Sequence, residues 1–534
     1  MTCAFQSCTN NKFAPHEECA LHCIKSNYQN DRRRGVLPEF YKLLSMYIAN
    51  FIDSTATPMF RTNSGHILPL PKSAPNFEIK ISQRIQNENL NEEEIRKLIS
   101  KRNVNESIVL RNIFFPDRKS KDSFDYFQLL ELFSDIHLLD CHFYIGDWQL
   151  RDVSFFFQNC IFYNQFDITP ITILSNDTDC LFSECEFKTK VRVSRIETNN
   201  IFEDSLFSGC NFKNLLGLEN LIFKKEPFLE LNEQSFVNTI LEIFNCTFEG
   251  IFKLNKIAVR YLQINDTNFL SSFEITNMKV ENFLCINTEM QGVFNAFESH
   301  FSYAKFERVK FYDVADFEKA EFGEADKIVI ASYPVTAIFR FVTFMTASNF
   351  KKVNFYYGLD FENVDLREQP NFLKSNINPY NTNRETFRII KYSFDSRGNT
   401  LEANRFFVQE MKAFKREMNI YGSKRDVLVY YMNDLISEFG GNYVKPIIWL
   451  IISLILYTML LSFHDWYFDN YNYFLHPCFN TLSVYANSTA RNFLPFSRFL
   501  ESKSGFEFIS LLFYIWFAIL IWQIVVAVKR HTQR

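Results

Sequence analysis

Aromatic residues recur every five positions in the middle of the chain. In the stretch FSYAKFERVKFYDVADFEKAEF, residues 301–322, Phe306 and Phe311 are five apart, as are Phe317 and Phe322. This period fits neither an α-helix, which repeats every 3.6 residues, nor a strand, which repeats every two. It predicts a square coil whose five-residue sides each send a central residue inward. Such coils, of about twenty residues each, would stack to bury a continuous core.

A second recurring phrase consists of an apolar residue, two free positions, Cys, one free position and Phe. Its copies are LLDCHF, FQNCIF, FSECEF, FSGCNF and IFNCTF. We interpret the phrase as an equivalent corner of stacked coils, with Phe on the axis and Cys in the tight place beside it. A metal or redox ladder is the alternative, but no His or carboxylate recurs with the Cys. The predicted core is Cys141, Phe143, Cys160, Phe162, Cys185, Phe187, Cys210, Phe212, Phe306, Phe311, Phe350 and Phe355.

Over residues 126–375 this pattern resembles the pentapeptide-repeat family. The resemblance implies a mainly β fold, the right-handed quadrilateral β-helix. The family prefers Leu or Phe at the central site and a small residue two positions before it. Residues 171–179 and 224–235 interrupt the pattern, and we expect them to be loops that protrude from the coils.

Two uncharged apolar runs lie near the C-terminus, Pro446–Phe463 with 18 residues and Phe508–Val528 with 21. A helix needs about 20 apolar residues to span a bilayer, so both runs predict membrane-spanning helices within a membrane domain at 444–534. Lys445 precedes the first run, and basic residues follow the second. The positive-inside rule therefore predicts that both termini are cytoplasmic. Buried helices of a soluble domain are the alternative.

Residues 381–443 predict two or three helices before the membrane. This stretch resembles a linker found in pentapeptide-repeat membrane proteins, with the matching elements Glu402–Met411, Gly440–Gly441 and Lys445–Pro446. In such relatives the two spans resemble the last two helices of a tetrameric cation channel. The loop between the spans departs from that pattern, because it has no filter of the TVGYG type.

The N-terminus carries Cys3, Cys8, Cys19 and His22 in the spacing C-x4-C-x10-C-x2-H. Three thiolates and an imidazole form a plausible tetrahedral Zn²⁺ set, and four protein ligands leave no open position for catalysis. Cys23 is another donor that could take the place of His22, and His16 is a spare donor. Reduced thiols without metal are the alternative.

The N-terminal region divides into a zinc-knuckle-like module at 1–30 and a helical adaptor and cap at 31–125. Within the adaptor, residues 37–54 predict an amphipathic helix, and a second helix is expected near NEEEIRKLISKR. The module is too small to bury a core of its own, so a structural metal would supply its folding energy. We expect it to dock a partner or a neighbouring protomer.

Charge divides along the chain. Residues 126–380 carry 22 Lys and Arg against 35 Asp and Glu, a net charge of −13, whereas both ends are mildly basic. No cleavable secretory signal opens the chain, and the Cys usage favours a reducing compartment. We therefore expect a multi-pass protein of the bacterial inner membrane whose β-helix lies in the cytoplasm.

The leading hypothesis is a membrane-anchored scaffold whose acidic β-helix binds a protein partner. One alternative is an oligomeric pore or a regulated membrane effector, such as one used in defence against phage. Another is a DNA mimic that binds a topoisomerase, as in the gyrase-protecting quinolone-resistance proteins, which the membrane tether argues against. We expect no enzymatic activity, because Walker, G-x-G-x-x-G and G-x-S-x-G motifs are absent, and we do not expect nucleic-acid binding.

Overall fold

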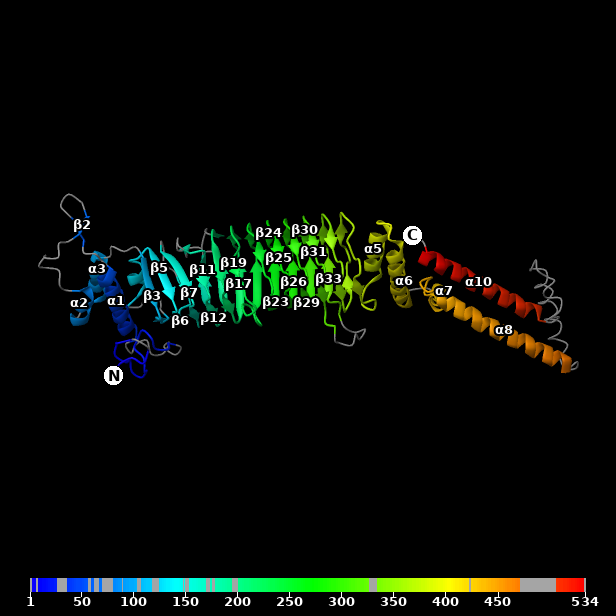
Figure 1. Cartoon of the computed structure of the whole chain (residues 1–534), viewed down its shortest axis with the longest axis horizontal. Coiled ribbons are helices and arrows are strands. Elements are labelled where there is room, and N and C mark those ends of the chain that lie inside the picture. Colours follow the sequence, from blue (N-terminus) through cyan, green and yellow to red (C-terminus); the bar gives the residue numbers. More distant parts are fainter. Residues whose placement is uncertain are drawn as a thin grey trace. The chain divides into compact units, whose positions relative to one another are not determined.

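The computed structural model describes residues 2–5, 8–25, 36–55, 59–61, 67–69, 80–88, 90–102, 107–117, 124–146, 148, 153–169, 173–174, 178–194, 200–325, 334–421, 424–470 and 506–532. These residues form two compact units. The first reaches to Asn376, apart from Ile330–Val335 and Gly358–Glu362, and is a β-solenoid with its N-terminal elements. The second holds Gly358–Glu362 and the helices that follow Ile377 (Figure 1).

Helices cover the N-terminal end of the solenoid (Figure 1). The elements before the first coil are α1 (Val36–Thr55), β1 (Met59–Arg61), β2 (Ile67–Pro69), α2 (Ile81–Asn87) and α3 (Glu92–Arg102). Along α1, apolar residues recur every four positions at Phe40, Leu44 and Ile48, and all three are buried. The Phe40 ring lies 6.0 Å from Phe115 and 5.2 Å from Tyr126, both edge-on. The predicted amphipathic helix therefore closes the first coil.

The solenoid consists of five ladders of parallel strands. The first ladder contains β3 (Ser107–Arg111), β5 (Asp135–Leu139), β7 (Ser154–Gln158), β11 (Cys180–Ser183), β15 (Ser205–Ser208) and β19 (Phe228–Glu230), with β10 (Ile173–Leu174) beside β7. The second contains β4 (Phe114–Phe115), β6 (His142–Phe143), β8 (Ile161–Phe162), β12 (Glu186–Phe187) and β16 (Asn211–Phe212). A short helix, α4 (Phe127–Leu130), precedes β5.

The longest ladder runs through β9 (Phe166–Ile168), β13 (Val191–Ser194), β17 (Leu215–Glu219), β20 (Ile240–Phe244), β23 (Ala258–Asn265), β26 (Lys279–Ile286), β29 (His300–Glu307), β32 (Glu321–Phe322) and β36 (Asn354–Phe355), with β33 (Ala337–Arg340) also on β29. The fourth contains β14 (Ile201–Phe202), β18 (Ile222–Phe223), β21 (Thr247–Phe248), β24 (Asn268–Phe269), β27 (Glu289–Met290), β30 (Lys310–Phe311), β34 (Thr343–Phe344) and β38 (Asp365–Leu366). The fifth contains β22 (Phe252–Lys253), β25 (Phe273–Glu274), β28 (Phe294–Asn295), β31 (Ala315–Asp316) and β35 (Ser348–Asn349).

Strand register confirms the predicted stacking of coils. In the longest ladder Ala258 opposes Lys279, which opposes His300, so each of these coils has 21 residues. In the second ladder the Phe of the recurring phrase pairs with the same Phe of the next copy, in the order Phe143, Phe162, Phe187 and Phe212. These four copies are therefore stacked corners, whereas the fifth, IFNCTF, lies in the fourth ladder, where Phe248 pairs with Phe223 and Phe269. One expectation was wrong in part: residues 171–179 and 224–235, expected as protruding loops, contribute β10 and β19 to the first ladder.

Phe rings form four columns inside the solenoid. Four rings of one coil stack on four rings of the next: Phe306 on Phe339, Phe311 on Phe344, Phe317 on Phe350 and Phe322 on Phe355. Their ring centroids are 4.7, 4.9, 4.8 and 5.1 Å apart and the rings are nearly parallel. That distance is the spacing of paired strands, so the backbone ladder sets the ring stacking. One Phe on each side accounts for the five-residue period.

Corners of the coil place non-glycine residues in the left-handed backbone region. At equivalent corners Asn245, Asp266 and Asn287 have φ angles of 50°, 51° and 51°. Asn and Asp tolerate this region better than other side chains. Asn245 Nδ2 donates to Asn220 Oδ1 at 2.8 Å, and Asn287 Nδ2 donates to Asp266 Oδ1. At the same corner of the next two coils Arg308 and Phe341 have φ angles of 53° and 54°, so the solenoid turns on non-glycine residues of several types in a chain with only 14 Gly.

The second unit holds the C-terminal helices. Its elements are α5 (Arg384–Asp395), α6 (Thr400–Tyr421), α7 (Lys424–Ser437), α8 (Val444–Asn470) and α10 (Glu507–Thr532), preceded by the short strands β37 (Leu359–Asp360) and β39 (Asn376–Ile377). The Asn383 side chain caps α5 by accepting from the Thr386 N–H at 2.8 Å. Phe394 of α5 stacks on Phe406 of α6, with ring centroids 5.5 Å apart. The predicted linker therefore forms three helices, which lead into two long apolar ones.

Candidate metal centre and apolar helix pair

Three thiols and one imidazole converge in the N-terminal module, defined here as residues 2–5 and 8–25. Cys3 Sγ lies 3.7 Å from His22 Nδ1, and Cys8 Sγ lies 3.8 Å from Cys19 Sγ. Cys19 Sγ lies 3.4 Å from His22 Nδ1, and all four ligand atoms lie within 4.8 Å of one another. The four residues that the spacing singled out therefore meet at one point and could bind a metal ion.

The distances between these atoms suit a tetrahedral ion. With metal–sulfur bonds of about 2.3 Å and metal–nitrogen bonds of about 2.0–2.1 Å, tetrahedral ligands stand about 3.8 Å apart for two sulfurs and about 3.6 Å apart for sulfur and nitrogen. The three contacts given above, 3.8, 3.7 and 3.4 Å, lie close to those values. Since all four atoms lie within 4.8 Å of one another, only small shifts are needed for them to surround one ion.

Backbone hydrogen bonds bring the ligands together. Cys3 N donates to Asn10 O at 2.8 Å, which folds the first two cysteines into one short antiparallel turn. The second pair lies on a helical turn, where His22 N donates to Cys19 O at 3.0 Å. Cys19 N donates to Cys3 Sγ at 3.1 Å and joins the two turns. Phe5 stacks on the His22 ring at 4.3 Å and fixes its plane.

His22, rather than Cys23, completes the set. Cys23 is fully buried but is outside the group of ligand atoms that lie within reach of one another. His16 is likewise outside that group, and its backbone N–H donates to Phe13 O at 2.7 Å. Among the residues that the structure describes, this is the one group of Cys, His, Asp or Glu arranged to hold a metal ion.

Burial perturbs the ionisation of the ligands. Burial raises the pKa of Cys8 and raises the pKa of Cys19 to about 12, and the nearby Cys3 adds to the effect on both. Burial also lowers the pKa of His22 to about 4, and the nearby Lys25 lowers it further. A neutral imidazole is ready to bind a cation, whereas these thiols need one to become thiolates. Metal binding by the cluster would therefore release protons from these thiols.

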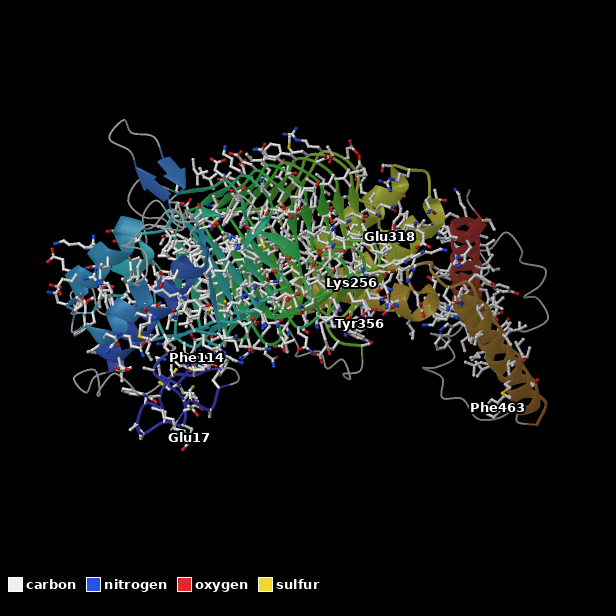
Figure 2. All side chains as sticks on the ribbon, turned by 60° about the vertical axis from the view of Figure 1, so that its left-hand side comes forward. Glu17, Phe114, Lys256, Glu318, Tyr356 and Phe463 are labelled. Carbon is white, nitrogen blue, oxygen red and sulfur yellow. The ribbon has the colours of Figure 1, made fainter. Side chains whose placement is uncertain are left out.

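The module is attached to the cap and the first coil of the solenoid. Leu21 O accepts a hydrogen bond from Phe114 N of β4 at 2.8 Å, and Figure 2 shows Phe114 beside the module. Lys25 is buried, its Nζ donates to Cys23 O at 2.9 Å, and it lies 5.4 Å from the Phe40 ring and 5.7 Å from the Phe114 ring. Burial lowers the Lys25 pKa to about 8. Sequence analysis missed this lysine, since nothing in its neighbourhood marks it as buried.

The cysteines of the solenoid are arranged differently. Cys141, Cys160, Cys185 and Cys210 are all fully buried in one column. Each thiol donates to the backbone carbonyl two residues before it and to a carbonyl of a preceding coil; for Cys185 these are Ser183 O at 3.3 Å and Phe157 O at 3.4 Å. Burial raises the pKa of Cys185 well above its ordinary value, so it stays a protonated donor. Thr239 and Ser299 repeat the pattern in later coils.

Two helices of the second unit are long and apolar enough to cross a membrane. Their apolar spans, Val444–His464 and Glu507–Thr532, include the predicted runs Pro446–Phe463 and Phe508–Val528. Only 11% and 17% of the spans is buried. Phe463 near the end of α8 is 61% exposed (Figure 2), and many other large apolar side chains also face outward: Ile448, Ile451, Ile452, Leu454, Ile455, Leu456, Met459, Leu512, Ile521, Trp522 and Val525.

Several polar side chains of this helix pair bond across to the partner helix instead. Trp516 Nε1 of α10 donates to Ser453 Oγ of α8 at 2.9 Å. Tyr457 Oη donates to Ser510 Oγ at 3.0 Å. The pair is therefore apolar outside and hydrogen-bonded inside, the reverse of a soluble hairpin. The predicted loop between the spans falls largely on residues 471–505, outside the described residues.

Comparison with known proteins adds no relative: no protein-family model, no curated protein and no solved structure matches this chain.

Proposed function

We propose that this chain is a membrane-anchored scaffold of the pentapeptide-repeat type. Two helices hold it in the bilayer, the solenoid offers its surface to a protein partner, and a structural Zn²⁺ holds the N-terminal module. The two termini lie in the cytoplasm, and the membrane is the bacterial inner membrane.

The apolar exterior of α8 and α10 carries this proposal. In water, exposing so many Ile and Leu side chains is unfavourable by about 25 cal/mol for each Å² of apolar surface. In the hydrocarbon core of a bilayer the same apolar surface carries no such cost. Hydrogen bonds between the helices, such as Trp516 to Ser453, contribute to holding the pair together. A helix hairpin with this distribution is typical of a membrane domain.

The charge at the ends of the helix pair supports the orientation. Lys445 stands at the start of α8, and Lys529 and Arg530 stand at the end of α10. The Tyr443 ring lies 5.4 Å from the His531 ring, so the two ends meet. Positive residues gathered at one end of a helix hairpin favour the cytoplasmic side.

The solenoid surface supports a binding role. Its cations pair with carboxylates of neighbouring coils: Lys319 with Glu298 at 2.6 Å, and Lys351 with Glu318 at 3.2 Å. Because residues 126–380 carry 35 acidic and 22 basic residues, carboxylates remain in excess after such pairing. A rigid acidic surface fits a partner with a basic face, and attraction of this kind weakens as salt rises.

The donor set supports zinc as the ion. Three thiolates with one imidazole form a common structural Zn²⁺ set, and four ligands leave no open position for a substrate. The sulfur atoms also disfavour Mg²⁺ and Ca²⁺, which take oxygen ligands.

Extraction of membranes tests the anchor. Full-length protein should stay in the membrane pellet after washing with alkaline carbonate, which strips peripheral proteins. The double variant Leu454→Arg and Ile521→Arg, which places charges on the outward faces of both helices, should lower that fraction sharply. Wild-type protein released by carbonate would overturn the anchor.

A charge reversal tests the scaffold. Detergent-solubilised protein carrying Glu203→Lys and Glu233→Lys, both exposed on the solenoid, should lose a partner that wild type retains at low salt. The matched control Asp395→Lys changes an exposed acid on α5 and should keep the partner. If the control and the solenoid variant lose the same proteins, the acidic surface is not the binding surface.

A further inference from the structure

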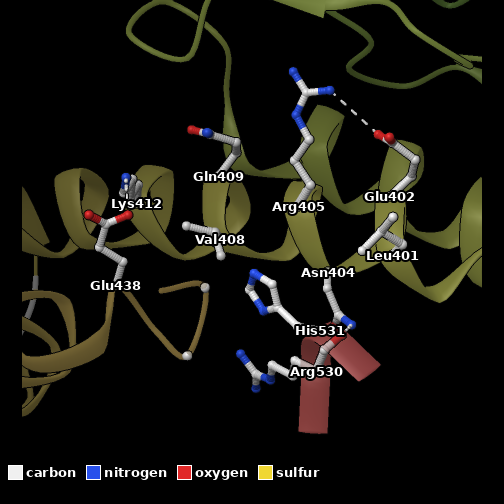
Figure 3. A pocket seen from close by; sticks show the side chains of 12 residues that line it. Leu401, Glu402, Asn404, Arg405, Val408, Gln409, Lys412, Glu438, Arg530 and His531 are labelled. Atoms are coloured by element: carbon white, nitrogen blue, oxygen red, sulfur yellow. Dashed lines mark hydrogen bonds and ion pairs between the residues drawn. The ribbon is translucent and has the colours of Figure 1, made fainter. Parts of the chain in front are cut away.

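A cavity of about 300 Å³, with polar side chains among its lining, lies where α10 ends beside α6 and the turn after α7 (Figure 3). Its lining is Leu401, Glu402, Asn404, Arg405, Val408, Gln409, Lys412, Glu438, Gly440, Gly441, Arg530 and His531. The elements that the sequence singled out before the membrane, Glu402–Met411 and Gly440–Gly441, therefore meet the basic end of α10. The whole cavity belongs to the second unit.

Two glycines shape the wall of this cavity. A Cβ on Gly441 would lie 2.5 Å from Val408 Cγ2, so only glycine lets the turn approach α6 this closely. Gly440 has a φ of +78°, and a Cβ there would lie 3.1 Å from an Arg530 guanidinium nitrogen. The glycine pair thus makes room for the Arg530 side chain.

Arg530 is held in place without a carboxylate. Its guanidinium donates to Phe439 O and lies 4.3 Å over the Phe407 ring, and its own backbone carbonyl accepts from Asn404 Nδ2 at 2.9 Å. Among the described residues, no Asp or Glu forms an ion pair with it. A half-buried cation with only neutral partners leaves donors for an anion.

The carboxylates that line the cavity are already neutralised. Glu438 pairs with Lys445 at 2.5 Å and with Lys412 at 3.8 Å. Glu402 pairs with Arg405 at 3.5 Å. His531 Nδ1 lies 3.1 Å from Ala527 O, so the other ring nitrogen is left for a ligand. The positive charge of Arg530 therefore remains uncompensated at the end of the helix pair.

We propose that this cavity binds the phosphate of an anionic lipid headgroup, with Arg530 as its main contact. The inference rests on the proposed membrane anchor, because only then do headgroups lie at the ends of α8 and α10. Phosphate accepts the forked hydrogen bonds of a guanidinium, and basic pockets beside the cytoplasmic ends of spans are where such headgroups bind. A headgroup there would link α10 to α6 and the Gly440–Gly441 turn.

Lipid binding to the full-length protein tests the site. Delipidated protein in a neutral detergent is titrated with phosphatidylglycerol or phosphatidylcholine, and retained lipid is counted by native mass spectrometry. Wild type should retain phosphatidylglycerol preferentially, and Arg530→Gln should weaken that binding by about fivefold. The matched control Lys529→Gln removes the adjacent charge, which does not line the cavity, and should bind as wild type does.

Two further measurements distinguish a lipid headgroup from free phosphate and a lost contact from a folding defect. Inorganic phosphate or glycerol 3-phosphate at the same concentration should not displace the lipid; if either does, the site is one for free phosphate and the headgroup proposal is overturned. Arg530→Lys keeps the charge but loses the guanidinium fork, so it should bind more tightly than Arg530→Gln and less tightly than wild type, and it guards against a folding defect in Arg530→Gln. Equal retention of both lipids, or unchanged binding in Arg530→Gln, also overturns the proposal. The lipid titration is made in detergent and does not depend on membrane anchoring. Release of the protein by carbonate would therefore contradict the membrane anchor but leave the result of the lipid titration as the test of this cavity.

Discussion

The N-terminal module and the solenoid both contain completely buried cysteines, Cys19 in the module and Cys185 in the solenoid, yet they use them in opposite ways. In the module Cys19 faces two other thiols and an imidazole, with Cys8 Sγ 3.8 Å and His22 Nδ1 3.4 Å away. In the solenoid Cys185 sits in a column between coils and donates to two backbone carbonyls. Burial raises the pKa of both thiols.

The difference lies in what surrounds each thiol. The solenoid already has a core, because each coil stacks its Phe rings on the next, and a protonated thiol only has to satisfy nearby carbonyls. The module lacks such a core, and its buried thiols and imidazole point at one another instead. Burial alone therefore says nothing about whether a cysteine binds metal; convergence with other donors does.

The largest expected effect is a matched pair of substitutions, Cys19→Ser and Cys185→Ser. We expect wild type to hold close to one equivalent of zinc after purification, Cys19→Ser to hold almost none, and Cys185→Ser to hold as much as wild type. Serine is a poor zinc ligand, and only the first substitution removes a member of the cluster. Elemental analysis of the purified proteins measures the metal.

Two results would contradict the assignment of zinc to the cysteines of the module. Equal zinc in wild type and Cys19→Ser would place the metal elsewhere in the chain. Less than about half an equivalent in fresh wild type would leave the cluster as ordinary reduced thiols, since a structural site is expected to be filled. Mild chelation of wild type should loosen the module to proteolysis while the β-rich circular dichroism of the solenoid stays.

Next in size is the loss of a ring from the solenoid core. Phe306 is fully buried and stacks on Phe339 at 4.7 Å. Phe306→Ala should lower the free energy of unfolding by about 3–5 kcal/mol, the usual cost of such a cavity. Denaturant unfolding followed by circular dichroism measures this, and zinc content should not change. A cost below about 1 kcal/mol would mean that the coils close around the gap.

The sequence predicts the solenoid well because its signal is repeated. Five-residue spacing of Phe implies sides of equal length, and the register of Phe162 on Phe187 confirms the 25-residue step read from the Cys phrases. The metal cluster was predictable for a related reason: four strong ligand types stand at short spacings, so a few turns bring them together.

Other features depend on contacts between distant segments and left no local signal. Lys25 is buried against Phe40 and Phe114, which follow it by 15 and 89 residues. In the sequence, Arg530 is only one of the basic residues that follow the second apolar run. In the fold, its guanidinium donates to Phe439 O. The solenoid Cys were interpreted as small apolar residues, and their role as hydrogen-bond donors appears only when the corner carbonyls are placed.

An intermediate effect is expected from pH on zinc binding by the module. Cys8 and Cys19, whose pKa values burial raises, are protonated at neutral pH and must each release a proton. His22, whose pKa is lowered to about 4, is already neutral and releases none. Zinc affinity should therefore rise with pH, by at least about a hundredfold per unit between pH 5.5 and 8. Competition with a chelator of known affinity measures the slope. A change of slope near pH 6.5 would show that His22 is protonated in the metal-free module, against the lowered pKa.

The smallest expected effect is the difference in stability between two substitutions of Cys185. It tests whether the Cys column depends on side-chain size or on hydrogen bonding. Ser and Ala have similar volumes, so Cys185→Ser and Cys185→Ala leave similar gaps, but only Ser keeps a donor for Ser183 O and Phe157 O. An isolated buried hydroxyl destabilises a core, whereas one with two carbonyls in reach contributes about 1 kcal/mol. Thr239 and Ser299, which make similar hydrogen bonds at other corners of the solenoid, show that hydroxyls fit such positions. We therefore expect the Ser variant to be more stable than the Ala variant by about 1 kcal/mol in denaturant unfolding. If Ala equals or exceeds Ser, the thiol is only a small apolar residue, and the solenoid Cys would differ from the module Cys in having no polar role at all.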